Sequence, residues 1–186
     1  MKKRIIGIVA LATVAGASVF ALARGVWAPA SSAPFVTDEP TLTMSTPGQC
    51  YFVWATQELT DLSAEYQTAV QTVAPEAEAR AAAFGENCVA ADGSSTFGAM
   101  ETDFYISLPV PDLADAEQLG TIIGQALVVT DGFARPRVPG GQDGFVEFTF
   151  RSGNEQRVLR VPIPRGRELR SRGLRGAELF QALQIP

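Results

Sequence analysis

Histidine is missing from this chain altogether, and lysine occurs only as Lys2 and Lys3. A Ser-His-Asp triad, a Cys-His dyad, an HExxH zinc site and a histidine-held haem therefore have no candidate residues. A Ser-Lys dyad, a Schiff base or a P-loop needs a lysine that the rest of the chain does not offer. Catalysis would have to rely on carboxylates, tyrosine, serine, arginine or a metal ion held by oxygen atoms.

Cysteine is also scarce, since Cys50 and Cys88 are the only two. Two cysteines so far apart, without histidine, make a poor zinc site, and we predict no metal site and no cofactor. In an oxidising compartment an even number of cysteines favours a disulfide, which would contribute about 4 kcal/mol by closing the loop between them. Two buried free thiols are the alternative.

The N-terminus has the pattern of an export signal. Three basic residues, Lys2 to Arg4, precede an uncharged apolar run over residues 5–23, and small-x-small cleavage sites follow at residues 21–23 and 28–30. The run is also close to the length that crosses a bilayer. Residues 1–30 are thus a cleaved export signal or an N-terminal membrane anchor. Both interpretations predict an exported, extracytoplasmic protein that touches the membrane only through this segment.

Residues 31–49 are rich in Ser, Thr and Pro and show no helical or alternating periodicity, which predicts a linker. Residues 50–186 would then be a single globular domain, long enough to enclose a hydrophobic core.

The domain is expected to alternate between strands and helices. Residues 50–56 are apolar at both parities, which is typical of a central strand covered on both faces, and Tyr51, Phe52 and Trp54 are therefore placed in the core rather than on a sugar-stacking platform. The other expected elements are a helix over 58–73, a helix over 75–84 ended by Gly85, two strands joined by a turn at Asp92-Gly93, a helix from Asp112 to about residue 130, strands over 144–150 and 157–163, and a last helix over 176–184.

This order predicts an α+β fold, in which helices pack on a mostly antiparallel sheet. It can be drawn as a split β-α-β-β-α-β unit with an extra hairpin strand and a C-terminal helix. Gly120 and Gly124, four residues apart within one expected helix, are interpreted as letting that helix approach the sheet closely.

The candidate catalytic residues are all carboxylates. Glu101 and Asp103 share one face of an expected strand, and Glu147 joins them if its strand is a neighbour. Such a set could act as acid and base in glycoside cleavage or hold a hard cation. The preferred interpretation is that this face is simply the solvated side of the sheet.

Charge is divided between two parts of the chain. From Phe35 to Asp131 there are fifteen acidic residues and one arginine, whereas from Gly132 to Pro186 there are ten arginines and five acids. Such asymmetry can mark an interaction surface or can be offset within the fold. The acidic pI of about 4.8 argues against nucleic acid as a partner.

Five of the arginines crowd into one short stretch: Arg165, Arg167, Arg170, Arg172 and Arg175. On an unbroken helix they would scatter around the axis, and Gly173 and Gly176 would interrupt it. We therefore expect an irregular approach to the last helix, with at least two arginines paired to carboxylates from residues 58–131. A docking site for an anionic surface is the alternative.

The stretches CYFVWATQEL, at residues 50–59, and AFGENCVAADG, at residues 83–93, resemble uncharacterised exported bacterial proteins. The resemblance spans about residues 50–180 and implies a single exported domain without a known activity. The sequence as a whole favours a non-catalytic envelope or secreted domain that binds an envelope protein or a glycan, or has a structural role. The alternatives are a carboxylate-based hydrolase acting on an envelope polymer and a small-molecule sensor.

Overall fold

The computed structural model describes residues 50–133 and 137–185, so the expected export segment (1–30) and linker (31–49) lie outside the described residues. The strands are β1 (Cys50–Glu58), β2 (Glu78–Ala90), β3 (Ser95–Pro109), β4 (Gln142–Ser152) and β5 (Glu155–Pro162), and the helices are α1 (Thr60–Gln71), α2 (Ala116–Asp131), α3 (Ile163–Ser171) and α4 (Gly176–Leu183). The expected α+β class is confirmed.

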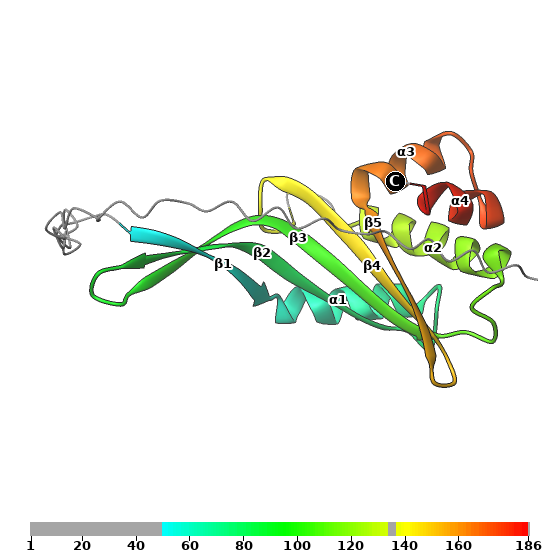
Figure 1. Ribbon diagram of the computed structural model, residues 1–186, viewed down its shortest axis with the longest axis horizontal. Helices are drawn as coiled ribbons and strands as arrows, with labels where there is room; N and C mark the ends of the chain where they lie inside the picture. Colours follow the sequence, from blue (N-terminus) through cyan, green and yellow to red (C-terminus); the bar gives the residue numbers. More distant parts are fainter. Residues whose placement is uncertain (1–49, 134–136, 186) are drawn as a thin grey trace, which may run out of the picture. The chain divides into compact units, whose positions relative to one another are not determined.

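The strands form one sheet, in which they follow the order of the chain from β1 to β5 (Figure 1). Three of the four neighbouring pairs are antiparallel, and only β3 and β4, which α2 connects, run parallel. A parallel pair needs such a crossover, because a short turn cannot return the chain to the same end of the sheet. The split arrangement of strands is not confirmed.

All four helices contribute to one hydrophobic core against one face of the sheet. The expected alternation in β3 is confirmed, since Phe104, Ile106 and Leu108 are buried. In β4, Phe148 and Phe150 are buried as well, and their rings stack with centroids 5.9 Å apart. Successive strand residues point to opposite faces, so the residues between these positions form the other face, which we call the open face of the sheet.

The helix expected over residues 75–84 is wrong, because this segment belongs to β2. Its sequence is rich in alanine, the best helix former, but helix propensity is a weak preference that tertiary contacts override. Here Ala81, Ala82 and Ala83 are buried between β1 and β3, with α1 alongside. The Ser63 hydroxyl of α1 donates to the Ala81 carbonyl and accepts from the Ala81 amide, which joins α1 to β2 at this position.

Helix α2 begins later than expected. Its N-cap is Asp115, which accepts a hydrogen bond from the amide of Gln118, whereas Asp112 accepts from the amide of Ala114 in the preceding turn. Both aspartates stabilise amides that have no helical partner, so the sequence could not tell the cap from the turn.

The glycines of α2 allow close contact with another helix, and not with the sheet as expected. A side chain on Gly120 would overlap the main-chain carbonyl of Gly176, and one on Gly124 would meet the Leu179 side chain at 3.3 Å. The glycine face of α2 thus lies against α4 rather than against the sheet (Figure 1). The carboxylate of Glu117 adds to the contact by accepting a hydrogen bond from the amide of Ala177, in the first turn of α4.

The arginine-rich stretch is more regular than expected, because residues 163–171 form helix α3 before the chain turns at Gly173. Pro164 occupies the first turn of this helix, where a missing N–H group is tolerated. The expected last helix is confirmed as α4.

Candidate functional site

Strand β1 is the edge strand of the sheet, not a central strand, and the expectation that its aromatic residues lie in the core is wrong. Tyr51, Phe52 and Trp54 are 63 %, 63 % and 65 % exposed, and Val53 is 46 % exposed. Apolar residues at both parities predict cover on both faces, but in the described part of the chain the side chains on both faces of β1 are largely exposed. Four consecutive large apolar residues are thus presented to solvent.

Phe52 and Trp54 lie on the open face of the sheet, in register with Cys88 and Glu86 of β2. The Trp54 ring stacks on Phe84, with ring centroids 5.4 Å apart and planes inclined by 15°. Beyond them, Glu86 pairs with Gly98 and Phe84 pairs with Glu101 on β3. Each of the two rings therefore has a carboxylate as its register partner on the next strand.

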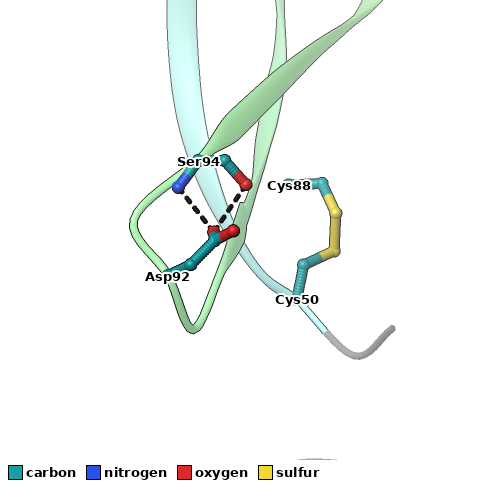
Figure 2. The surroundings of a disulfide bond; sticks show 4 residues. All are labelled: Cys50, Cys88, Asp92 and Ser94. Carbon is teal, nitrogen blue, oxygen red and sulfur yellow. Dashed lines mark hydrogen bonds between the residues drawn. A yellow bond between two sulfur atoms is a disulfide. The ribbon is translucent and has the colours of Figure 1, made fainter. Parts of the chain in front are cut away.

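The disulfide between Cys50 and Cys88 is confirmed, and it ties the start of β1 to β2 with a Cα–Cα distance of 5.3 Å. Figure 2 shows it beside the turn between β2 and β3, where Asp92 accepts hydrogen bonds from the hydroxyl and the amide of Ser94. These bonds hold the pKa of Asp92 below its usual value. The turn at Asp92-Gly93 is as expected, and Gly93 has a positive φ of 82° that suits glycine.

We call residues 50–58, 84–90 and 95–101 the β1 arm. In Figure 1, β1 and the adjoining ends of β2 and β3 extend beyond α1. A bulge in the β2–β3 pairing lies between Phe84 and Gly85, and a side chain on Gly85 would overlap the main chain of Gly98. Gly85 thus permits close approach of two strands and does not end a helix as expected.

The three candidate carboxylates lie on the open face of the sheet. Tyr105 pairs with Glu147 across β3 and β4, while Glu101 and Asp103 precede Tyr105 on β3. Glu147 accepts from two nitrogens of Arg160, at 2.8 and 3.2 Å. This ion pair occupies Glu147 and leaves Glu101 and Asp103 as the other two candidates of the set.

Asp103 is the unusual member of the set. It is only 4 % exposed, and its Oδ1 accepts from the amide of Phe145 at 3.2 Å. Burial raises its pKa from 3.8 to about 6, with smaller contributions from the negative charges of Glu101 and Glu147, while the Phe145 hydrogen bond and Arg160 act in the opposite direction. A carboxylic acid that titrates near pH 6 can serve as a general acid if substrate reaches it.

Two arginines cover aromatic rings on this face. The Arg80 guanidinium lies 3.8 Å from the Tyr105 ring centroid, and that of Arg160 lies 4.1 Å from the Phe145 centroid. Arg80 also pairs with Glu58 on β1 at 2.8 Å. A depression of about 270 Å³ lies here, lined by Gln67, Glu78, Ala79, Arg80, Tyr105, Ile106, Ser107, Glu147 and Thr149; Asp103 and Glu101 do not line it.

A larger depression of about 650 Å³ lies where α1 begins. Two of its acidic residues are paired, Glu58 with Arg80 and Glu65 with Arg137 at 2.5 Å. Among the residues that the structure describes, no group of three potential ligands could hold a metal ion.

Replacing Asp103 by asparagine should remove a pH-dependent loss of stability. Because the pKa of this acid is raised in the folded state, the folded state binds the proton more tightly, and its contribution to the free energy of unfolding falls as the pH rises from about 4 to about 6. The asparagine oxygen can still accept from the Phe145 amide. Between pH 4 and pH 7, the free energy of unfolding of D103N, measured in urea, should rise by roughly 2 kcal/mol relative to that of the wild type.

The control for this measurement is E155Q, which removes one negative charge at the start of β5, away from Asp103. The assignment of a raised pKa to Asp103 would be contradicted by either of two results. The first is a difference in free energy of unfolding between D103N and the wild type that does not change with pH, and the second is the same change in E155Q.

The five arginines of this stretch form ion pairs or hydrogen bonds within the molecule. Arg167 and Arg170 both pair with Asp131 at the end of α2, which confirms that at least two arginines meet carboxylates from residues 58–131. Arg165 and Arg172 both pair with Glu168 of their own helix. The remaining member of the stretch is Arg175, which donates to the carbonyl oxygens of Arg170 and Leu174.

The exposed β1 aromatics were missed because local sequence does not say where in a sheet a strand lies.

The chain matches no known family model, no curated protein and no solved structure. The resemblance to uncharacterised exported proteins therefore stays an expectation, and function has to be argued from the surface itself.

Proposed function

We propose that this chain is an exported binding module that recognises its partner through the β1 arm. The observation that carries the proposal is the exposure of Tyr51, Phe52, Val53 and Trp54 on an edge strand. Folded proteins seldom leave contiguous large apolar patches in water unless the patch binds something. Aromatic residues are also enriched at interfaces, because they bring a large contact area at low entropic cost.

Export is supported by the N-terminal pattern in the sequence and by the Cys50–Cys88 bond, which is compatible with an oxidising compartment. Within residues 50–133 and 137–185, no helix is long and apolar enough to cross a membrane. Fractionation of cells that produce the tagged full chain tests this part of the proposal. We expect the protein outside the cytoplasmic membrane or attached to its outer side, and a purely cytosolic pool would contradict export.

A serine triple variant tests the binding surface. Replacing Tyr51, Phe52 and Trp54 together should abolish binding to the ligand class that the protein recognises, because it removes the exposed rings and leaves the core unchanged. The matched control replaces exposed apolar residues elsewhere by serine: Val128, Val158 and Ile185, which are 61 %, 52 % and 68 % exposed.

Binding of both variants and of the wild-type full chain is measured against four classes of probe: extended peptides, cell-wall oligosaccharides, anionic lipid vesicles and the protein itself. We expect one class to bind the wild type and the control equally and the β1 triple variant at least ten times more weakly. Equal loss in both variants, or no dependence on β1 for any class, would contradict the proposal.

A carboxylate-based hydrolase is the second candidate, and the raised pKa of buried Asp103 favours it. Its test is hydrolysis of envelope glycans by the wild type and by D103N. Turnover that is lost in D103N, while binding survives, would support the enzyme. Equal turnover by both proteins would contradict the role of Asp103, and no turnover by the wild type would leave the binding module as the function.

A further inference from the structure

The outer edge of β1 is an unprotected strand edge. Among the residues that the structure describes, β1 pairs with β2 alone, so its other row of amide and carbonyl groups faces away from the described sheet. Natural edge strands are usually protected by charges, proline or bulges, since a bare edge invites another strand. From Cys50 to Gln57, β1 has none of these, and Glu58 carries its first charge.

The opposite edge of the sheet shows the contrast. β5 contains Glu155, Arg157, Arg160 and Pro162 within eight residues. The β5 edge of the sheet is therefore protected and the β1 edge is not, which makes β1 the edge able to accept an added strand.

The open face of the sheet repeats one arrangement of side chains. Arg80 of β2 lies over Tyr105, its register partner on β3, and pairs with Glu58 of β1. Arg160 of β5 lies over Phe145 of β4 and pairs with Glu147. In both cases an arginine from a neighbouring strand meets an aromatic ring and a carboxylate.

The β1 arm has the ring and the carboxylates of this arrangement, and the structure records no cation over the rings among the described residues. Trp54, stacked on Phe84, stands in register with Glu86, while Phe84 stands in register with Glu101. Beside Glu86, Gly98 leaves open space, with only the Glu86 carbonyl oxygen within 4 Å of where a side chain would begin. A neighbouring strand that could carry the arginine would have to be added at the β1 edge.

We propose that an extended peptide with an arginine or lysine pairs with the outer edge of β1 and places that cationic side chain over Trp54, toward Glu86. This inference rests on the proposed function and names the chemistry of its partner. Residues opposite each other on paired strands have Cβ atoms about 5 Å apart, so a side chain opposite Trp54 reaches the ring. A cation over an indole ring is attracted by the negative π face.

Charge complementarity argues for a basic peptide over a second copy of the chain. The β1 arm contains three acidic residues, Glu58, Glu86 and Glu101, and no basic residue, and Glu58 is already paired with Arg80. A second β1 would bring Trp54 and Glu58 again and no cation. A basic strand supplies both the hydrogen bonds that the edge lacks and the charge that the carboxylates attract.

The test uses the full chain with Trp27→Phe, which leaves Trp54 as its only tryptophan. Its fluorescence is titrated with a nine-residue peptide of alternating Val and Thr with a central Arg, and with matched peptides in which that Arg is Gln or Glu. We expect the Arg peptide to bind about ten times more tightly than the Gln peptide and the Glu peptide to bind most weakly. E86Q should remove most of the preference for Arg, and E155Q should leave it unchanged.

Equal binding of the three peptides would overturn the inferred cation site, and absence of peptide binding would overturn the added strand. Concentration-dependent dimerisation that Trp54→Ser abolishes would replace the peptide by a second copy and so overturn the inference. Oligosaccharide binding lost in the β1 triple variant would do the same, while leaving the proposed binding module intact. If no probe depends on the β1 aromatics, both proposals fail.

Discussion

Replacing Cys50 and Cys88 together by serine should lower the free energy of unfolding by about 4 kcal/mol. The bond closes a segment with a sequence separation of 38 that includes all of α1, so breaking it gives the unfolded chain much more freedom. It also ties the start of β1 to β2, in addition to the strand pairing, the Trp54–Phe84 stacking and the Arg80–Glu58 ion pair.

Urea unfolding of the oxidised wild type and of the double variant measures the loss. Reduced wild-type protein is the control, because it lacks the bond but keeps the sequence, and it should lose the same amount. A loss below about 1 kcal/mol would show that the bond constrains the unfolded chain little. In cells, peptides linked through Cys50 and Cys88 are expected in protein recovered outside the cytoplasmic membrane, and two alkylatable thiols in that sample would contradict the disulfide in the exported protein.

Replacing Gly120 by alanine should destabilise the protein by about 3 kcal/mol. The new methyl group would overlap the Gly176 carbonyl, which belongs to the main chain of α4 and cannot rotate away. Helix α4 would have to move from α2, and Leu179 and Phe180 would leave the core with it.

Gly124→Ala is the matched control on the same helix. Its methyl group would meet the end of the Leu179 side chain at 3.3 Å, and that side chain can shift. Both substitutions gain the same helix propensity, up to about 1 kcal/mol, so the difference between them isolates the clash. Equal stability of the two variants in urea unfolding would contradict the close packing of α2 on α4.

Features governed by neighbouring residues could be predicted from the sequence. The alternation from Phe104 to Leu108 shows a strand with one buried face, and the turn at Asp92-Gly93 has its own local chemistry. The disulfide followed from cysteine parity and the expected compartment, and α4 from its apolar spacing between glycine and the chain end. The sequence placed Glu101 and Asp103 on one face of a strand, but whether Glu147 joins them depends on β3 and β4 being neighbours, which the sequence left open.

Features set by the rest of the fold could not be predicted. The alanines from Ala81 to Ala83 favour a helix locally and form a strand only because β1, β3 and α1 enclose them. The apolar pattern of β1 is the same for a strand inside a sheet and for an exposed edge strand. Arg170 shows the same limit in α3, since its pairing with Asp131 depends on how α2 and α3 meet.

Hydrogen exchange along β1 tests the central claim most directly. In the free full chain, amides of β1 that face away from β2 should exchange quickly, since nothing described in the structure pairs with them. Saturation with the peptide that binds best should slow exchange in residues 51–57 at least tenfold, while β5 remains unchanged as the internal control. Protection that appears elsewhere, with β1 unaffected, would contradict the assignment of β1 as the surface through which this protein meets its partner.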